Sequence, residues 1–81
     1  MSNTRVDGQY RTSDLYFAAF LKTAGVILID AVKEEGRTQF VFEKSDSIPD
    51  LKRGFFNRSA KVVALDYADD IRSLKSMTFT I

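Results

Sequence analysis

The stretch VILIDAVKEEGRTQFVFEK, residues 26–44, limits the folds open to this chain more than any other segment. Its first part is rich in β-branched residues, its middle is a polar break that ends in Gly36, and its last part places Phe40 and Phe42 on one face. Glycine takes the positive φ that a short hairpin turn with a bulge requires. The stretch predicts an antiparallel β-hairpin, and helices must cover its aromatic face because an isolated hairpin is marginally stable in water.

The length and composition exclude several classes of protein. A chain of 81 residues forms one domain and buries roughly 60–65% of the surface that its unfolded state exposes, which leaves little room for a cofactor-sized cavity. Without cysteine there is no disulfide or thiolate-bound zinc, and without histidine the commonest proton shuttle and metal ligand are missing. We therefore expect no enzyme, no cofactor and no small-molecule substrate. A net charge of +1 argues against a globally basic nucleic-acid-binding protein.

Residues 14–24 form the first expected helix, with Thr12 or Ser13 as its capping residue and Gly25 as its stop signal. Only three positions in this segment are polar, so apolar side chains surround nearly the whole helix. A surface helix of a small domain usually keeps a polar face. This helix must therefore be covered on two sides within its own fold or contact another chain.

Two further helices are expected after the hairpin. A short one runs from Ile48 to about Phe56, with proline in its first turn, and a longer one starts near Val63. The final residues 77–81 alternate between apolar and polar side chains. This alternation predicts a third strand along the hairpin, with a frayed tail as the alternative.

Together these elements predict a small α+β domain over residues 10–81, with an antiparallel sheet covered by helices on one face. Its expected order is helix, strand, strand, helix and helix, followed by a third strand if residues 77–81 pair with the hairpin. The polar segment 1–9 has no periodic pattern and is expected as a flexible lead-in. No signal peptide is visible, because the first apolar run, residues 15–21, is too short to cross a bilayer. We expect a cytoplasmic protein without membrane contact.

The phrases YRTSDLYFAAFL, TQFVFEK and KVVALDYADDIRSLKSM, within residues 10–79, carry a resemblance to a known family. They resemble a family of short proteins of unknown function from bacteria and their phages. A Thr-Ser-Asp-Leu helix start, a glycine, a Phe-x-Phe strand and a closing Tyr…Arg-x-Leu-Lys helix recur there in this order. The resemblance implies the order of the elements and a phage or prophage setting in a bacterial host cell. It implies no activity and no functional residue.

Three acids near the start of the last helix are the main candidates for metal chemistry. Asp66 and Asp70 are four residues apart and share a helix face, with Asp69 adjacent, so their oxygens could bind Mg²⁺. Acids early in a helix are also favoured by the helix dipole. We interpret the three as helix-start residues and expect no metal site. No glycine-rich phosphate loop exists, because the four glycines are isolated from one another.

The segment KRGFFNRSAK, residues 52–61, is basic and aromatic and contains no acid. Such a run could contact a phosphate backbone and stack bases, as surfaces that bind single strands do. The alternative is an ordinary solvated helix end. The nucleic-acid hypothesis assigns contacts to Lys52, Arg53, Arg58 and Lys61, to Phe56 as a stacking side chain, and to Arg72 and Lys75 if the last helix packs beside this segment.

The apolar helix at residues 14–24 supports a different function, which we rank first: a non-enzymatic interaction protein that associates with itself or with another protein. Surplus apolar surface marks sites of self-association or partner binding. Tyr16 and Phe20 share one flank of the helix and Phe17 lies beside them. These three residues are the expected contacts of a symmetric homodimer. The alternative is that the helix is enclosed between the sheet and the other two helices.

Overall fold

The structure, a computed structural model, describes residues 8–80, which form a three-stranded antiparallel sheet and three helices. In chain order the elements are β1 (Gln9–Thr12), α1 (Leu15–Thr23), β2 (Leu28–Glu34), β3 (Arg37–Glu43), α2 (Ile48–Phe56) and α3 (Ala64–Thr80). The strands lie in the order β1-β3-β2, so the last strand along the chain is the central one. The predicted α+β class is confirmed.

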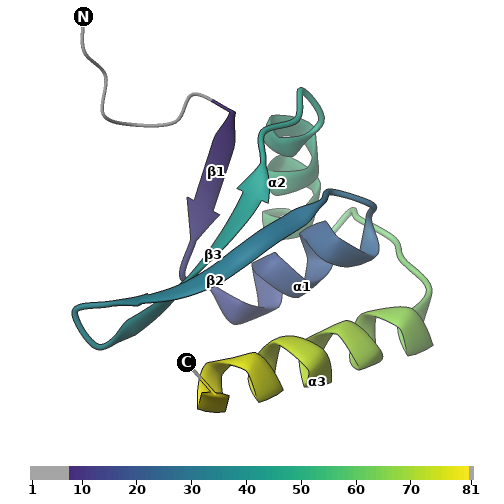
Figure 1. The fold of residues 1–81 in the computed structure, drawn as a ribbon. Helices are drawn as coiled ribbons and strands as arrows, with labels where there is room; N and C mark the ends of the chain where they lie inside the picture. Colours follow the sequence, from purple (N-terminus) through teal and green to yellow (C-terminus); the bar gives the residue numbers. More distant parts are fainter. Residues whose placement is uncertain (1–7, 81) are drawn as a thin grey trace, which may run out of the picture.

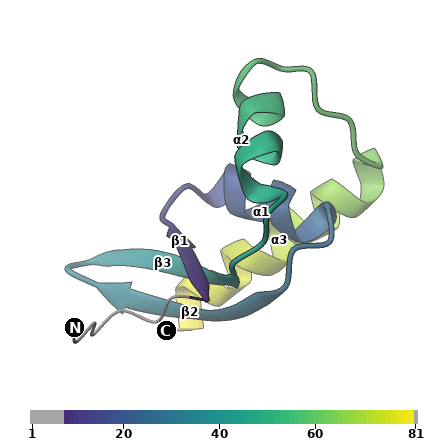
Figure 2. The same cartoon turned by 90° about the horizontal axis from the view of Figure 1, so that it is seen from above.

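The helices gather on one side of the sheet (Figures 1 and 2). α3 runs beside α1, and α2 packs against α1 on a different flank. The sheet and both other helices therefore enclose α1, which is the environment that a helix without a polar face requires. Among residues 8–80, no helix is long and apolar enough to cross a membrane.

The β2–β3 hairpin confirms the prediction made from residues 26–44. Its turn consists of Glu35 and Gly36, with φ values of 53° and 80°. Two consecutive residues with positive φ define the tight turn whose twist matches that of the flanking strands. The irregularity in pairing lies between Leu28 and Asp30, at the start of β2 and away from the turn. The hairpin was therefore predicted correctly, while the bulge expected at the turn lies at the other end of the strand.

The central strand β3 supplies the apolar inner face of the sheet. Phe40 lies opposite Ala31 of β2 and Thr12 of β1, and Phe42 lies opposite Leu28 and Tyr10. Residues directly opposite in an antiparallel pair point to the same face. Phe40 and Phe42 are fully buried against the helices, as the alternation in the sequence predicted.

The first helix starts one residue later than expected. Asp14 is its N-cap, and its carboxylate accepts hydrogen bonds from the backbone N–H groups of Tyr16 and Phe17 at 3.0 and 3.1 Å. Thr12, one of the two predicted caps, accepts a hydrogen bond from the N–H of Asp14 at 3.1 Å instead. The helix ends before Gly25, whose φ of 98° fits glycine, so the predicted stop is confirmed.

The core joins the inner face of the sheet to α1 and α3. Its largest fully buried side chains are Phe17, Leu21, Phe40, Phe42 and Leu74. Half-buried side chains from α2 and α3 extend this cluster around α1. One connected cluster therefore serves all the layers of the fold, as expected for a small single domain.

Two parts of the predicted element order are wrong. Residues 77–80 belong to α3 and form no strand, because Met77 continues the inward face that Leu74 occupies one turn earlier. The third strand is β1, which pairs with β3 from Gln9 to Thr12. Gln9 therefore belongs to the sheet and not to the lead-in. Of the rest of the predicted lead-in, Gly8 lies in a turn and its carbonyl accepts a hydrogen bond from the Lys44 N–H at 2.6 Å. Residues 1–7 lie outside the described residues, as does residue 81.

Candidate functional site

Exposed apolar side chains concentrate where α2 passes into α3. Among residues 8–80, seven large hydrophobic side chains are exposed. Three of them, Phe56, Val63 and Leu65, lie within residues 56–65 and are each more than half exposed. We call this segment, from the last residue of α2 to the first turn of α3, the α2–α3 corner. The other four are Tyr16 on α1, Ile27 and Ile29 near the start of β2, and Phe79 near the end of α3.

The corner turns sharply because the chain folds back onto α2. Arg58 adopts a φ of 66°, and the N–H groups of Ser59 and Ala60 then donate to the Gly54 carbonyl at 2.9 and 3.1 Å. A Cβ atom added at Gly54 would lie 3.6 Å from the Ala60 Cβ. Gly54 therefore lies where the returning chain packs against α2, and there is room for only a small side chain at this position.

An aromatic cluster anchors the corner to α1. The Phe55 ring lies 5.3 Å from Phe17 and 5.2 Å from Phe20, measured between ring centroids. Phe56 lies 5.6 Å from Phe17 and 5.0 Å from Phe55, at an angle of 88° to the latter ring. Such distances are typical of favourable aromatic pairs. Phe56 is thus fixed on one side while its other side faces outward, as the sequence hypothesis for a stacking side chain requires.

Two grooves border the returning segment of the corner. The larger, of about 570 Å³, lies between the end of α1, α2 and residues 59–63, and its charged lining residues are Asp50, Lys61 and Asp66. The smaller, of about 270 Å³, is lined by Phe20, Phe55, Arg58, Ala60, Val62 and Tyr67. Small-molecule sites usually measure about 300–1,000 Å³. The smaller groove is therefore suited to a single side chain rather than to a cofactor.

The six predicted basic contacts do not form one patch. Arg53 pairs with Asp50 at 2.8 Å, and Arg72 pairs with Asp69. Within residues 8–80, Lys52, Arg58, Lys61 and Lys75 make no ion pair. Arg72 and Lys75 lie on α3, which packs against α1 rather than against α2. The structure therefore groups only the basic residues of α2 and the corner, and acids lie among them.

The first helix offers one of its three predicted contact residues to a partner. Phe17 and Phe20 are 1% and 4% exposed and belong to the core, whereas Tyr16 is 53% exposed. The prediction that Phe17 and Phe20 contact a partner is therefore wrong. Both side chains are buried because the sheet, α2 and α3 cover α1. The sequence showed that the helix needed cover, and only the tertiary packing shows that its own chain provides it.

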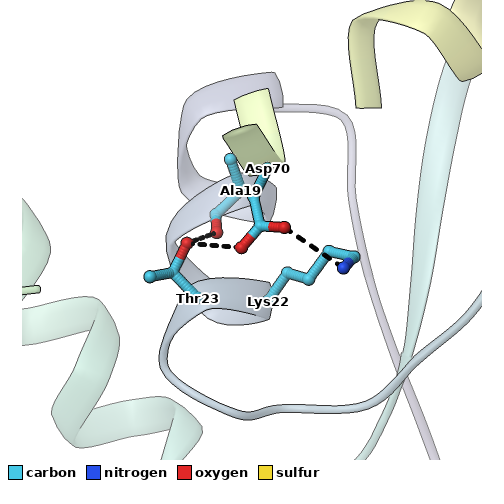
Figure 3. Close-up of polar contacts among 4 residues, drawn as sticks. All are labelled: Ala19, Lys22, Thr23 and Asp70. Carbon is cyan, nitrogen blue, oxygen red and sulfur yellow. Dashed lines mark hydrogen bonds and ion pairs between the residues drawn. The ribbon is translucent and has the colours of Figure 1, made fainter. Parts of the chain in front are cut away.

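Two of the three acids of α3, Asp69 and Asp70, pair with other side chains, whereas Asp66 lines the larger groove. Asp70 connects α3 to α1: one carboxylate oxygen accepts from the Lys22 amine at 3.2 Å and the other from the Thr23 hydroxyl at 2.8 Å (Figure 3). The Thr23 hydroxyl also lies 2.9 Å from the Ala19 carbonyl, to which it can donate. Within the part of the chain that the structure describes, no three acidic side chains gather in a way that could hold a metal ion.

Tyr67 closes one side of the smaller groove and links α3 to α1. Its hydroxyl donates to the Tyr16 carbonyl at 3.2 Å. Burial raises the pKa of Tyr67, and the nearby Asp14 and Tyr16 raise it further. A tyrosine with the ordinary pKa is already neutral at pH 7, and the raised pKa extends to higher pH the range over which the phenol keeps its hydrogen for this contact.

The fold and this surface define a small α+β domain with an exposed apolar corner beside two shallow grooves. Residues 7–80 match a family described as a domain of unknown function (DUF5659), and the chain belongs to this family. Comparison with curated proteins and with solved structures gives no significant match.

Proposed function

We propose that this protein is a non-enzymatic binding module that recognises another protein through the α2–α3 corner. The observation that carries the proposal is the concentration of Phe56, Val63 and Leu65, all exposed, within ten residues of chain beside two grooves. Contiguous exposed apolar surface with a polar rim is typical of interaction sites. Phenylalanine and arginine, the residue types of Phe56 and Arg58, are also enriched at protein–protein interfaces.

The geometry favours a macromolecular partner over a metabolite. The larger groove is open and the smaller one accommodates about one side chain, whereas a small-molecule site encloses most of its ligand. Phe56 is supported from below by Phe17 and Phe55, so its outer side is presented at little further cost in conformational entropy. A rigid aromatic side chain of this kind suits a protein surface that packs over it.

A second copy of the chain is one such partner, and self-association stays within the proposal. Because Phe17 and Phe20 are buried, the contact is assigned to the corner, with Tyr16 as the exposed contribution of α1. The resemblance to short bacterial and phage proteins supports a phage or prophage setting. A cytoplasmic location in the bacterial host cell belongs to the same proposal.

Site-specific photocrosslinking tests the proposal in bacterial cells. A photoreactive phenylalanine analogue replaces Phe56 in one variant and Phe79 in a matched control, since both are exposed aromatic residues on helices. We expect a discrete adduct from position 56 and none from position 79. The adduct mass distinguishes a second 9.2 kDa copy from a different protein. No adduct at either position, or the same adducts at both, would contradict the proposal.

Weak binding to nucleic acid is the second candidate function, because Lys52, Arg58 and Lys61 make no ion pair within residues 8–80. Three phosphate contacts would give a slope of roughly −2 to −3 in a plot of log affinity against log salt concentration. Titration of labelled single- and double-stranded oligonucleotides measures this slope. No binding at high micromolar protein in low salt removes this candidate.

A further inference from the structure

Arg58 stands at a position that normally favours glycine. It follows Asn57, the C-cap of α2, and its φ of 66° lies in the left-handed region. Glycine is the usual residue at this place because a side chain introduces steric strain there. Within residues 8–80, the Arg58 guanidinium makes no ion pair and no side-chain hydrogen bond that would offset this strain. The arginine side chain is therefore unexplained by the local fold.

The smaller groove gives this side chain a chemical context. Its walls come from the aromatic cluster, the returning chain and α3, and Arg58 is the only charged residue among the six that line it. A groove of about 270 Å³ with apolar walls and one cation is complementary to a single apolar side chain that carries a negative charge beside it. The planar guanidinium binds carboxylates through two parallel hydrogen bonds.

The charges around the corner favour a peptide over a polyanion. A nucleic-acid strand that continued from Arg58 toward Lys61 would meet the larger groove, which Asp50 and Asp66 also line. Like charges at these positions repel a continuous phosphate backbone. A peptide segment carries its negative charge at one point, and its apolar neighbours can pack against the exposed ring of Phe56, which is not among the residues that line the larger groove with those acids.

We propose that the smaller groove binds an acidic, apolar segment of a partner protein, with one apolar side chain between Phe20, Phe55 and Tyr67 and the adjacent carboxylate on Arg58. This inference rests on the proposed function and names the chemistry that the corner selects. Arg58 is the residue that determines specificity, because the carboxylate is the feature that distinguishes this segment from a purely apolar one. The left-handed backbone at residue 58 brings Arg58 into the lining of the groove.

Two small probes test the inference by NMR titration of the ¹⁵N-labelled full chain. N-acetylphenylalanine carries an aromatic ring and a carboxylate, and N-acetylphenylalaninamide has the same ring without the charge. We expect the acid to shift the amide signals of Phe55, Ala60 and Tyr67 and to bind about two- to fivefold more tightly than the amide, the range that an exposed ion pair supports.

Arg58→Gly removes the guanidinium at a position that glycine fits, so this variant is expected to fold with a raised Tm. In this variant the preference for the acid should disappear. Lys52→Gln is the matched control, because it removes a positive charge from α2 at a residue outside the smaller groove. The control should keep the preference.

Three outcomes overturn the inference. The first is equal binding of the acid and the amide to the unmodified protein, and the second is an unchanged preference in Arg58→Gly. The third is that neither probe shifts the amide signals of the groove residues. This includes the case in which an oligonucleotide or a second copy of the chain shifts those signals instead. If crosslinking at position 56 still gives a discrete protein adduct in these cases, the proposed function stands and only the carboxylate selection fails.

Discussion

Replacing Asp70 by alanine should destabilise the protein by far more than replacing its neighbour Asp69. Asp70 is 19% exposed and accepts from Thr23 and Lys22 on α1, whereas Asp69 is 69% exposed and pairs only with Arg72 one turn along the same helix. A hydrogen bond to a charged group contributes about 1.5–3 kcal/mol, and an exposed ion pair contributes about 0–1 kcal/mol. The two adjacent carboxylates thus form a matched pair that differs in what they contact.

The expected loss for Asp70→Ala is about 2 kcal/mol in the free energy of unfolding. It lies toward the lower end of the summed range because the Thr23 hydroxyl keeps the Ala19 carbonyl as an alternative acceptor. For a domain of this size the loss corresponds to a fall in Tm of about 8–16 °C. Asp69→Ala should change the stability by less than about 0.5 kcal/mol.

Urea unfolding followed by circular dichroism at 222 nm measures both values on the same chain. Asp70→Asn separates charge from hydrogen bonding, since the amide oxygen can still accept from Thr23 but no longer attracts Lys22. Its loss should fall between those of the two alanine variants. Equal losses for Asp69→Ala and Asp70→Ala would refute the reasoning, because the contact between α1 and α3 would then carry no measurable energy.

Three further substitutions test other parts of the fold. Phe40→Ala should cost about 3–5 kcal/mol in urea unfolding, since its ring is fully buried at the centre of the sheet; a loss below about 1 kcal/mol would remove Phe40 from the core. Gly54→Ala should stabilise the protein by about 0.5–1 kcal/mol, because alanine favours the helix and its Cβ would lie at an ordinary contact distance of 3.6 Å from the Ala60 Cβ. Destabilisation would show that the returning chain lies too close to residue 54 for a methyl group. The pKa of Tyr67 is raised above the ordinary value of 10 in the folded state, so the folded chain holds this proton more tightly than the unfolded chain does. The free energy of unfolding therefore falls as the pH rises through and above 10. In Tyr67→Phe this part of the alkaline loss should be absent, and urea midpoints from pH 8 to 11 that run parallel in the two proteins would contradict the assignment.

The sequence predicted elements whose signals are local. The hairpin follows from the glycine turn and the alternation of Phe40 and Phe42, and the inner stripe of α2 follows from the spacing of Ile48, Leu51 and Phe55. β1 was missed because it has only four residues, too few for a clear alternation, and its partner β3 is distant in the chain. Residues 77–80 alternate in sequence but continue a helix, because Met77 also satisfies the helical period.

The candidate site was predicted only in part. Phe56 and Arg58 were named from the basic, aromatic composition of their segment, whereas Val63 and Leu65 were not. The doublet of Val62 and Val63, directly before α3, was the available signal, since adjacent side chains point in different directions and both seldom face inward. The left-handed conformation of Arg58 could not be predicted from the sequence. The neighbouring Asn57 prefers that conformation more strongly, so the sequence would have assigned it to Asn57.

The position of β3 between its two neighbours has a consequence for the order of folding. The β2–β3 hairpin closes through a two-residue turn, whereas β1 reaches β3 only after the intervening chain has been brought round, as the pairing of Gln9 with Glu43 shows. Short hairpins form in about 1–10 μs, and contacts between distant residues form more slowly. β1 is therefore expected to join an already assembled hairpin, so that substitutions in β1 accelerate unfolding while leaving the refolding limb of a chevron plot nearly unchanged.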